Sequence, residues 1–234
     1  MKLIAGENST QDIICSSDGN SCKFLNELEE LRNQVSLLTE LVRTDALTGL
    51  FNFRFFHETI LLEMERARRG SQTLSMILLD IDYFKKFNDS WGHELGNQAL
   101  VLIAKLIKIA IRKLDCACRF GGEEFVILLP NTDLCQAVQV AERLREMIAT
   151  TPLAVTGRDF IPVTASFGVD EFSMYMSDTT EGFVQRVDSF LYQAKQGGRN
   201  TVCHPELIAR TETAAVTLEE KDALFNVLHD DSQN

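Results

Sequence analysis

The sequence predicts an α+β domain whose strands and helices follow the order βαββαβ and form an antiparallel sheet with helices on one face. One observation is a continuous apolar run before Asp80, which is typical of a buried strand. A second is segment 119–130, where two glycines separate a short apolar stretch from a longer one, as in a β-hairpin. A third is the amphipathic segments between these strands. The 234 residues suffice for one domain with terminal extensions.

The N-terminal part is predicted to be a tail followed by a helix. Residues 1–22 mix small and polar residues without periodicity, so we expect a mobile tail. Residues 23–44 repeat apolar residues at alternating steps of four and three, the seam of a coiled coil. Two interpretations are open: a stalk that dimerises the protein, which we favour, or a lone amphipathic helix packed on its own domain. The seam residues are Phe24, Leu28, Leu31, Val35, Leu38 and Val42.

Residues 45–204 are predicted to form the main domain, because apolar periodicity and turn residues alternate throughout this range. Residues 205–234 form an acidic C-terminal tail, which could cap the domain, meet a partner or stay disordered. The expected elements are helix 55–69, strand 75–82, helix 94–113, hairpin 119–130, helix 133–150, strand 163–169, helix 181–196 and strand 201–203.

The hairpin turn consists of Gly121 and Gly122, followed by Glu123 and Glu124. Glycine can adopt positive φ and leaves no side chain above the backbone, so a phosphorylated ligand could approach the turn closely. The two glutamates are expected to face opposite sides of the segment. Taken alone, two adjacent carboxylates at a turn usually form only a solvated loop.

A second acidic stretch changes that interpretation. Asp80 and Asp82 end the buried strand at positions i and i+2, hence on one face. Acids at the end of a buried strand are costly without a cation. If this end lies beside the hairpin, Asp80, Glu123 and Glu124 form a cluster of hard oxygen ligands of the kind that holds Mg²⁺ against substrate phosphates.

Composition excludes several functional classes. The net charge is −11 and no basic stripe is present, so neither nucleic acid nor an anionic membrane surface is an expected partner. No apolar segment is long enough to insert into a membrane and no signal peptide is visible. The six cysteines form no Cys-x-x-Cys pair, which indicates reduced thiols in a cytoplasmic protein.

Four separated motifs resemble the GGDEF family of diguanylate cyclases, and the resemblance covers residues 45–203. It implies a palm-like, ferredoxin-like nucleotide-cyclase fold and the condensation of two GTP into cyclic di-GMP with release of two pyrophosphates. The motifs are Asp45-x-Leu47-Thr48-Gly49-Leu50-x-Asn52, Asp80-x-Asp82-x-Phe84-Lys85-x-x-Asn88-Asp89-x-x-Gly92-His93-x-x-Gly96, Gly121-Gly122-Glu123-Glu124-Phe125 and Ala194-Lys195-x-x-Gly198-Arg199-Asn200.

The resemblance also implies residue roles. Mg²⁺, or Mn²⁺ in its place, would be held by Asp80, the carbonyl of Ile81, Glu123 and Glu124, with Glu124 also a candidate base for the 3′-hydroxyl. A metal pair lowers the pKa of the attacking hydroxyl and neutralises the leaving pyrophosphate. The triphosphate would be neutralised by Lys85, Lys195 and Arg199, together with backbone amides near Tyr83 and Phe84.

The base-contacting positions contain a departure. Asn88 matches the family, but Asn97 stands where the family commonly has Asp, and Asn offers guanine one acceptor where Asp offers two. Two interpretations are open: relaxed selectivity, with ATP used to make cyclic GMP-AMP, or a loss of affinity alone. Phe53 also departs from the family, which usually has Arg there.

The chemistry joins two nucleotides held by two domains, so a homodimer is expected. Arg112 and Asp115 match the inhibitory site for the product cyclic di-GMP, with Arg143 and Arg66 as contributors. A surface ion pair between the first two is the alternative. The stalk could also bind a regulatory protein. Two other functional classes remain open: a silent domain that binds GTP or cyclic di-GMP, and a structural dimerisation module.

Overall fold

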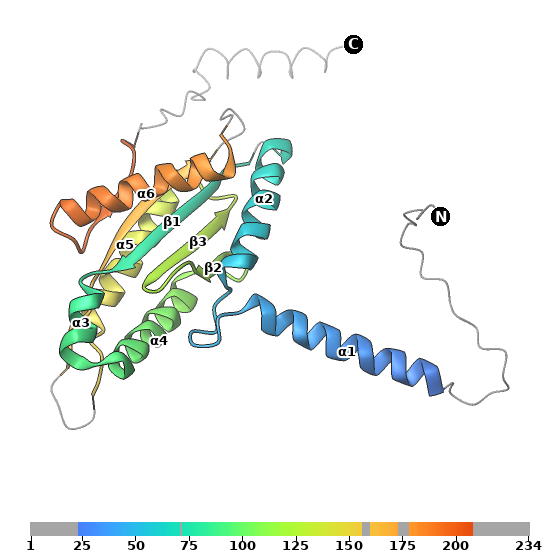
Figure 1. The fold of residues 1–234 in the computed structure, drawn as a ribbon. Helices are drawn as coiled ribbons and strands as arrows, with labels where there is room; N and C mark the ends of the chain where they lie inside the picture. Colours follow the sequence, from blue (N-terminus) through green and yellow to red (C-terminus); the bar gives the residue numbers. More distant parts are fainter. Residues whose placement is uncertain (1–22, 71, 156–159, 173–177, 208–234) are drawn as a thin grey trace, which may run out of the picture. The chain divides into compact units, whose positions relative to one another are not determined.

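A computed structural model describes residues 23–70, 72–155, 160–172 and 178–207 (Figure 1). The expected N-terminal tail and nearly all of the acidic C-terminal segment lie outside the described residues. The chain divides into two units, residues 1–204 and 205–234. Among the described residues, no helix combines the length and the apolar character that a membrane span requires.

The elements confirm the predicted order and add one helix. Helix α3 was not predicted, because its eight residues are too few to show a repeating apolar pattern. It ends at Trp91 and is followed by Gly92, whose φ of 85° favours glycine. Helix α5 begins as predicted, with Asp133 accepting a hydrogen bond from the Gln136 amide. The elements are α1 (Lys23–Arg43), α2 (Phe53–Gly70), β1 (Leu74–Ile81), α3 (Phe84–Trp91), α4 (His93–Ala110), β2 (Cys116–Arg119), β3 (Glu124–Pro130), α5 (Leu134–Thr150), β4 (Ala165–Phe172), α6 (Thr180–Gln196) and β5 (Val202–Cys203).

The five strands form one sheet in the order β2-β3-β1-β4-β5, which can be followed in Figure 1. Strand β1 pairs antiparallel with β3 and with β4, and β2 pairs antiparallel with β3, so the predicted hairpin is confirmed. Only the short β5 is parallel to its neighbour. The central position of β1 explains its continuous apolar sequence, because both edges and both faces of this strand are covered.

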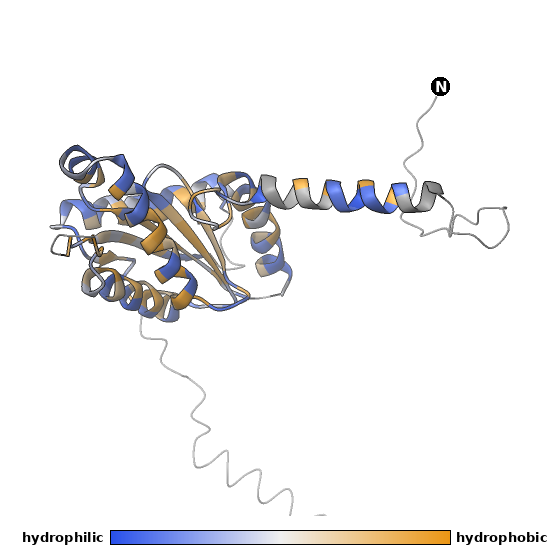
Figure 2. Cartoon of the chain, turned by 90° about the horizontal axis from the view of Figure 1, so that it is seen from below, coloured by the Kyte–Doolittle hydropathy of each residue, from blue (hydrophilic) through white to orange (hydrophobic). Residues whose placement is uncertain are grey.

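The prediction that helices cover one face of the sheet is wrong, because they cover both. Alternate residues of β1 point to different cores: Ile77 and Leu79 pack with α4 and α5, whereas Met76 and Leu78 pack with α2 and α6. Figure 2 shows the strands coloured mainly as hydrophobic. A sheet covered by helices on both faces loses the polar alternation that a one-sided sheet would show.

Helix α6 packs closely on the sheet through Gly168 of β4. A Cβ atom at this position would overlap the backbone of Val187 and Leu191. The absence of a side chain therefore sets the distance between α6 and the sheet. This matters for the site, because α6 carries Lys195.

The predicted stalk is a helix, α1, with exposed apolar side chains. Leu28, Leu31, Val35 and Leu38 are between 43% and 60% exposed in the single chain. Figure 2 shows hydrophobic and hydrophilic residues interspersed along this helix. A row of exposed apolar residues at coiled-coil spacing provides a surface that a second helix could cover.

Candidate active site

The pairing of β1 with β3 places the predicted acidic residues at one end of the sheet. Asp80 lies opposite Glu124 in the strand register, and the amide of Ile81 donates a hydrogen bond to the carbonyl of Glu123 at 3.3 Å. Both glutamates are partly exposed, whereas Asp80 is buried. The acids that are far apart in the sequence therefore meet where β1 ends.

Lys195 is a counterion within this cluster. Its Nζ lies 2.9 Å from Asp80 Oδ2. Burial raises the pKa of Asp80, and the nearby Asp82 charge adds to this, although Lys195 opposes both effects. Burial and the Asp80 charge likewise raise the pKa of Glu123 and of Glu124. Ionised together, the three carboxylates carry more negative charge than one ammonium group neutralises.

The donor set suits a hard divalent cation. Carboxylate and carbonyl oxygens are the preferred ligands of Mg²⁺, and a cation would stabilise the ionised form that burial and neighbouring charge disfavour. Within the described residues, no three acidic, histidine or cysteine side chains already stand close enough to hold a metal ion. The side chains of Asp80, Glu123 and Glu124 fit such an ion by charge and chemistry.

Asp82 has a different environment from Asp80. Its Oδ2 accepts hydrogen bonds from the Thr164 hydroxyl at 2.7 Å and the Asn200 amide at 3.0 Å, and its Oδ1 accepts one from the Ser166 hydroxyl at 2.6 Å. These donors belong to the start of β4 and to the turn after α6. Asp82 therefore holds three segments together, a role that its sequence spacing to Asp80 did not reveal.

The segments that Asp82 joins contain unusual backbone conformations. Tyr83, Arg199 and Asn200 have φ values of 55°, 66° and 43°. The Arg199 guanidinium lies over the Tyr83 ring, 4.1 Å from its centroid, and donates to the Tyr83 hydroxyl at 3.0 Å. Left-handed backbone at non-glycine residues clusters at functional sites. Lys85 is exposed on α3, which begins directly after Tyr83.

Asn88 presents an unsatisfied polar atom. Its Oδ1 is buried and is the single buried side-chain nitrogen or oxygen among the described residues that has no hydrogen-bond partner. This oxygen faces Gly96, where a Cβ atom would overlap it. Asn97, the next residue, is exposed and lines a cavity on α4 together with Leu47 and Gln98. A buried acceptor without a partner suits a ligand that supplies an N–H donor.

The residues predicted for product inhibition gather near the start of β2. The Arg112 amide donates to Asp115 Oδ2 at 2.6 Å, and Arg143 Nη2 donates to the carbonyl of Ala110 at 2.6 Å. Arg66 is on α2, pairs with Glu63 and lines a cavity that Leu114 also lines. Burial raises the pKa of Asp115, and Arg112 opposes this effect.

The hairpin turn is held by an arginine that was not among the predicted site residues. Arg119 donates to the carbonyls of Gly121 and Gly122, with Nη2 2.7 Å from the latter, and its Nη1 lies 3.3 Å from both carboxylate oxygens of Asp45. Asp45 also accepts hydrogen bonds from Thr48. The sequence offered only a partial signal: Arg119 lies two residues before Gly121 and Asp45 belongs to the first motif, but nothing in the sequence pairs the two residues.

The expectation that the hairpin glycines adopt positive φ is wrong, because neither does. A Cβ at Gly121 would lie 2.7 Å from Glu124 Oε2, whereas at Gly122 nothing lies within 4 Å. The first glycine therefore leaves room for the Glu124 carboxylate. The second leaves open space above the turn.

The sequence of this chain is similar to those of known proteins. Residues 42–201 match the family described as "Diguanylate cyclase, GGDEF domain". Response regulator PleD of Caulobacter vibrioides is 41% identical over 173 residues, which are 74% of this chain and 38% of PleD. This chain therefore spans less than half the length of PleD.

Two crystal structures share the fold. One is the coiled coil and GGDEF domain of DgcB from Caulobacter crescentus in complex with c-di-GMP, with a TM-score of 0.73 and 29% identity, covering 77% of this chain and 95% of that one. The other is diguanylate cyclase SiaD in complex with its activator SiaC from Pseudomonas aeruginosa, with a TM-score of 0.68 and 37% identity, covering 78% and 69%. The similarity to DgcB includes a helical segment before the domain.

Proposed function

The chain belongs to the GGDEF family of diguanylate cyclase domains, and on this premise we propose that it condenses two GTP molecules into cyclic di-GMP and releases two pyrophosphates. The observation that carries the proposal is the alignment of Asp80 with Glu124 across β1 and β3, beside Glu123 and Lys195. A domain that binds no cation would gain nothing from this grouping, because burial raises the pKa of all three acids and the Asp80 charge further raises the pKa of Glu123 and of Glu124.

The acidic cluster would hold Mg²⁺, or Mn²⁺, through Asp80, the Ile81 carbonyl, Glu123 and Glu124. When bound, the metal supplies Lewis-acid activation of the 3′-hydroxyl and neutralises charge on the leaving pyrophosphate. Lys195 now pairs with Asp80, and it would turn to the triphosphate once a metal neutralises that carboxylate. Glu124, whose pKa is raised by burial and by Asp80, is suited to accept the proton of the attacking hydroxyl.

The rest of the nucleotide would be held by α3, α4 and the turn after α6. Lys85 and Arg199 would neutralise phosphate charge, and the amides of Tyr83 and Phe84 lie where α3 begins. Asn88 Oδ1 would accept from a base N–H. The donor it needs is present on guanine at N1 and N2, and on adenine at N6.

A hybrid activity that also uses ATP is the second candidate, and Asn97 favours it. An amide at this position offers one acceptor and one donor, which matches the mixed edge of adenine. Asn97→Asp should then raise the preference for GTP over ATP about 5- to 160-fold, the equivalent of a charged hydrogen bond of about 1–3 kcal/mol. An unchanged ratio would restrict the role of Asn97 to affinity.

Two copies must face each other, because each domain binds one nucleotide and the product contains two. Pairing of α1 through Leu28, Leu31, Val35 and Leu38 would raise the local concentration of the second domain. The same helix would be the surface for a regulatory protein. The structural relative SiaD is known in complex with an activator, SiaC.

Product inhibition is proposed at Arg112 and Asp115, with Arg143 and Arg66 as further contacts for the phosphates of cyclic di-GMP. Arg112→Ala should leave the initial rate unchanged and remove the slowing of the reaction as product accumulates. Progress curves with and without a phosphodiesterase that removes cyclic di-GMP would measure this. Equal slowing in the variant and the wild type would count against the site.

The decisive experiment is incubation of the full chain with Mg²⁺ and equal GTP and ATP, followed by mass spectrometry of the products. Cyclic di-GMP should form, and the Glu124→Gln variant should form none. Mixed product would support the hybrid activity. Absence of any cyclic dinucleotide from a protein that is dimeric would overturn the proposal and favour a binding module.

A further inference from the structure

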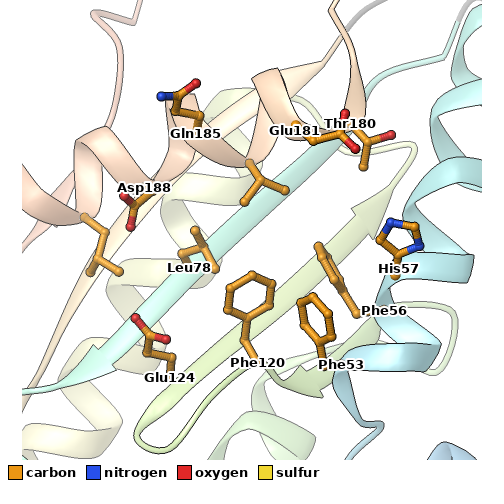
Figure 3. A pocket seen from close by; sticks show the side chains of 12 residues that line it. Phe53, Phe56, His57, Leu78, Phe120, Glu124, Thr180, Glu181, Gln185 and Asp188 are labelled. Carbon is orange, nitrogen blue, oxygen red and sulfur yellow. The ribbon is translucent and has the colours of Figure 1, made fainter.

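A cavity of about 440 Å³ lies between α2 and α6, beside the acidic cluster (Figure 3). Its floor is apolar, since Phe56, Leu78 and Leu191 are 2%, 3% and 2% exposed. The Phe120 ring meets the rings of Phe53 and Phe56 edge-on, with centroids 5.1 Å and 5.3 Å apart. This volume and lining are in the range of sites for small organic ligands.

Half of the polar side chains that line the cavity are acidic. These are Glu124, Glu181 and Asp188, which accompany His57, Thr180 and Gln185, and among the described residues no lysine or arginine lines the cavity. In Figure 3, Glu124 and Asp188 lie toward one end of the cavity, whereas Glu181 and His57 lie toward the other. A nucleotide is a poor match, because its phosphates would face these carboxylates and not Lys195 or Arg199.

We propose that this cavity binds an organic cation with a flat apolar body, of the arylalkylammonium class. The rings of Phe53, Phe56 and Phe120 and the aliphatic floor take the apolar body, and the ammonium group pairs with the carboxylates at the rim. The site is distinct from the nucleotide site and shares Glu124 with it. Its occupancy would therefore compete with charge neutralisation at the acidic cluster.

Phe53 provides a matched test, because it lines the cavity and is 50% exposed. A guanidinium at this position would stand at the mouth of the cavity and repel a cationic ligand. Phe53→Arg should fold normally, since the side chain at this position has room in solvent. Phe53→Leu keeps the lining apolar and is the control.

The experiment is isothermal titration of the full chain, without metal or nucleotide, using three ligands of one shape. Tryptamine carries an ammonium group, tryptophol a hydroxyl and indole-3-propionate a carboxylate. Tryptamine should bind about tenfold more tightly than tryptophol, and indole-3-propionate more weakly than both. Phe53→Arg should weaken tryptamine binding by about tenfold or more, and Phe53→Leu by about threefold or less.

Equal affinity for the three indoles, or no measurable binding of tryptamine, would overturn the proposal. So would unchanged tryptamine affinity in Phe53→Arg, because the ligand would then sit elsewhere. Glu181→Gln adds a second check, since it removes charge at the rim without touching the acidic cluster, and it should weaken tryptamine but not tryptophol. Because no turnover is measured, these results are independent of the cyclase activity.

Discussion

Asp80 and Asp82, separated by one residue at the end of β1, occupy opposite kinds of environment. Asp80 faces the hairpin and α6, where burial and, to a smaller extent, the charge of Asp82 raise its pKa and Lys195 is its ion-pair partner. Asp82 faces the start of β4 and the turn after α6, where three protein donors satisfy its oxygens. The first region concentrates charge, and the second neutralises it through hydrogen bonds.

The difference indicates that some acidic residues of the site are available to bind a ligand, whereas others hold the structure together. Two groups are available to a ligand. The ionised form of Asp80 is disfavoured by burial even with Lys195 beside it, and the buried oxygen of Asn88 has no hydrogen-bond partner. A group that is fully bonded internally positions others, as Asp82 does for the turn that carries Arg199. Substitutions should therefore separate the two roles.

Asp80→Asn should have the largest effect, a loss of turnover of about 10³-fold, because the charge that attracts the metal is removed. Stability should stay the same or rise, since one of three mutually repelling carboxylates is gone. Product formation and the unfolding midpoint should be measured on the same preparation, with Asp80→Ala as the control. Recovery of activity by Asn relative to Ala would mean that the hydrogen bond, not the charge, matters at this position.

Asp82→Ala should act in the opposite way, lowering the free energy of unfolding by about 2–3 kcal/mol through three lost hydrogen bonds. The KM for GTP should rise about tenfold, because the turn with Arg199 loses its anchor. Asp82→Asn should recover most of both effects, since the amide oxygen can accept from Asn200 and Thr164 while the Ser166 hydroxyl reorients. Chemical denaturation and initial rates check this, and an Asn variant no better than Ala would contradict it.

The two hairpin glycines allow the effects on activity and on stability to be separated at a single turn. Gly121→Ala should lower turnover about tenfold with little loss of stability, because the new Cβ displaces only the flexible end of Glu124. Gly122→Ala meets no protein atom, so any loss of activity must come from a ligand that needs the space. Steady-state rates and unfolding midpoints of both variants decide this. A large stability loss in Gly121→Ala would show that the turn itself, not Glu124, was disturbed.

The smallest expected effect is a pH dependence at Asp45. Burial raises its pKa, but hydrogen bonds from Thr48 and the charge of Arg119 outweigh this, so the net pKa is lowered. A lowered native pKa means that Asp45 stabilises the fold above its unfolded pKa and ceases to do so as pH falls through the native pKa. Asp45→Asn should melt slightly below the wild type at pH 6, with the gap closing toward pH 3. A gap that is constant with pH would exclude this linkage.

Much of the fold followed from local patterns. The apolar run of β1, the hairpin and the Asp133 cap are signals contained in a few adjacent residues, and each element formed where expected. The arrangement of helices did not follow, because the uniform burial of β1 is equally compatible with different numbers of covering helices. Helix α3 was missed because it is only eight residues long, and a helix that short depends on packing for its stability.

The candidate site shows the same limit. The proximity of Asp80, Glu123 and Glu124 could be predicted, because a buried strand and a hairpin with an acidic turn are expected to pair in one sheet. The roles of Asp82 and Arg119 could not be predicted, since their partners Thr164, Ser166, Asn200 and Asp45 are 74 or more residues away in the sequence. Hydrogen bonds over such separations depend on topology, which spacing alone does not specify.

The central position of β1 also has a consequence for how the protein is made. Asp80 lies opposite Glu124 in one neighbouring strand and opposite Ser166 in the other, so both partners are translated after β1 itself. On the ribosome, one edge of this apolar strand stays open until β4 emerges, and open apolar edges recruit other chains. Synthesis of this domain should therefore pass through a stage that depends on chaperones, and chains truncated before residue 165 should aggregate.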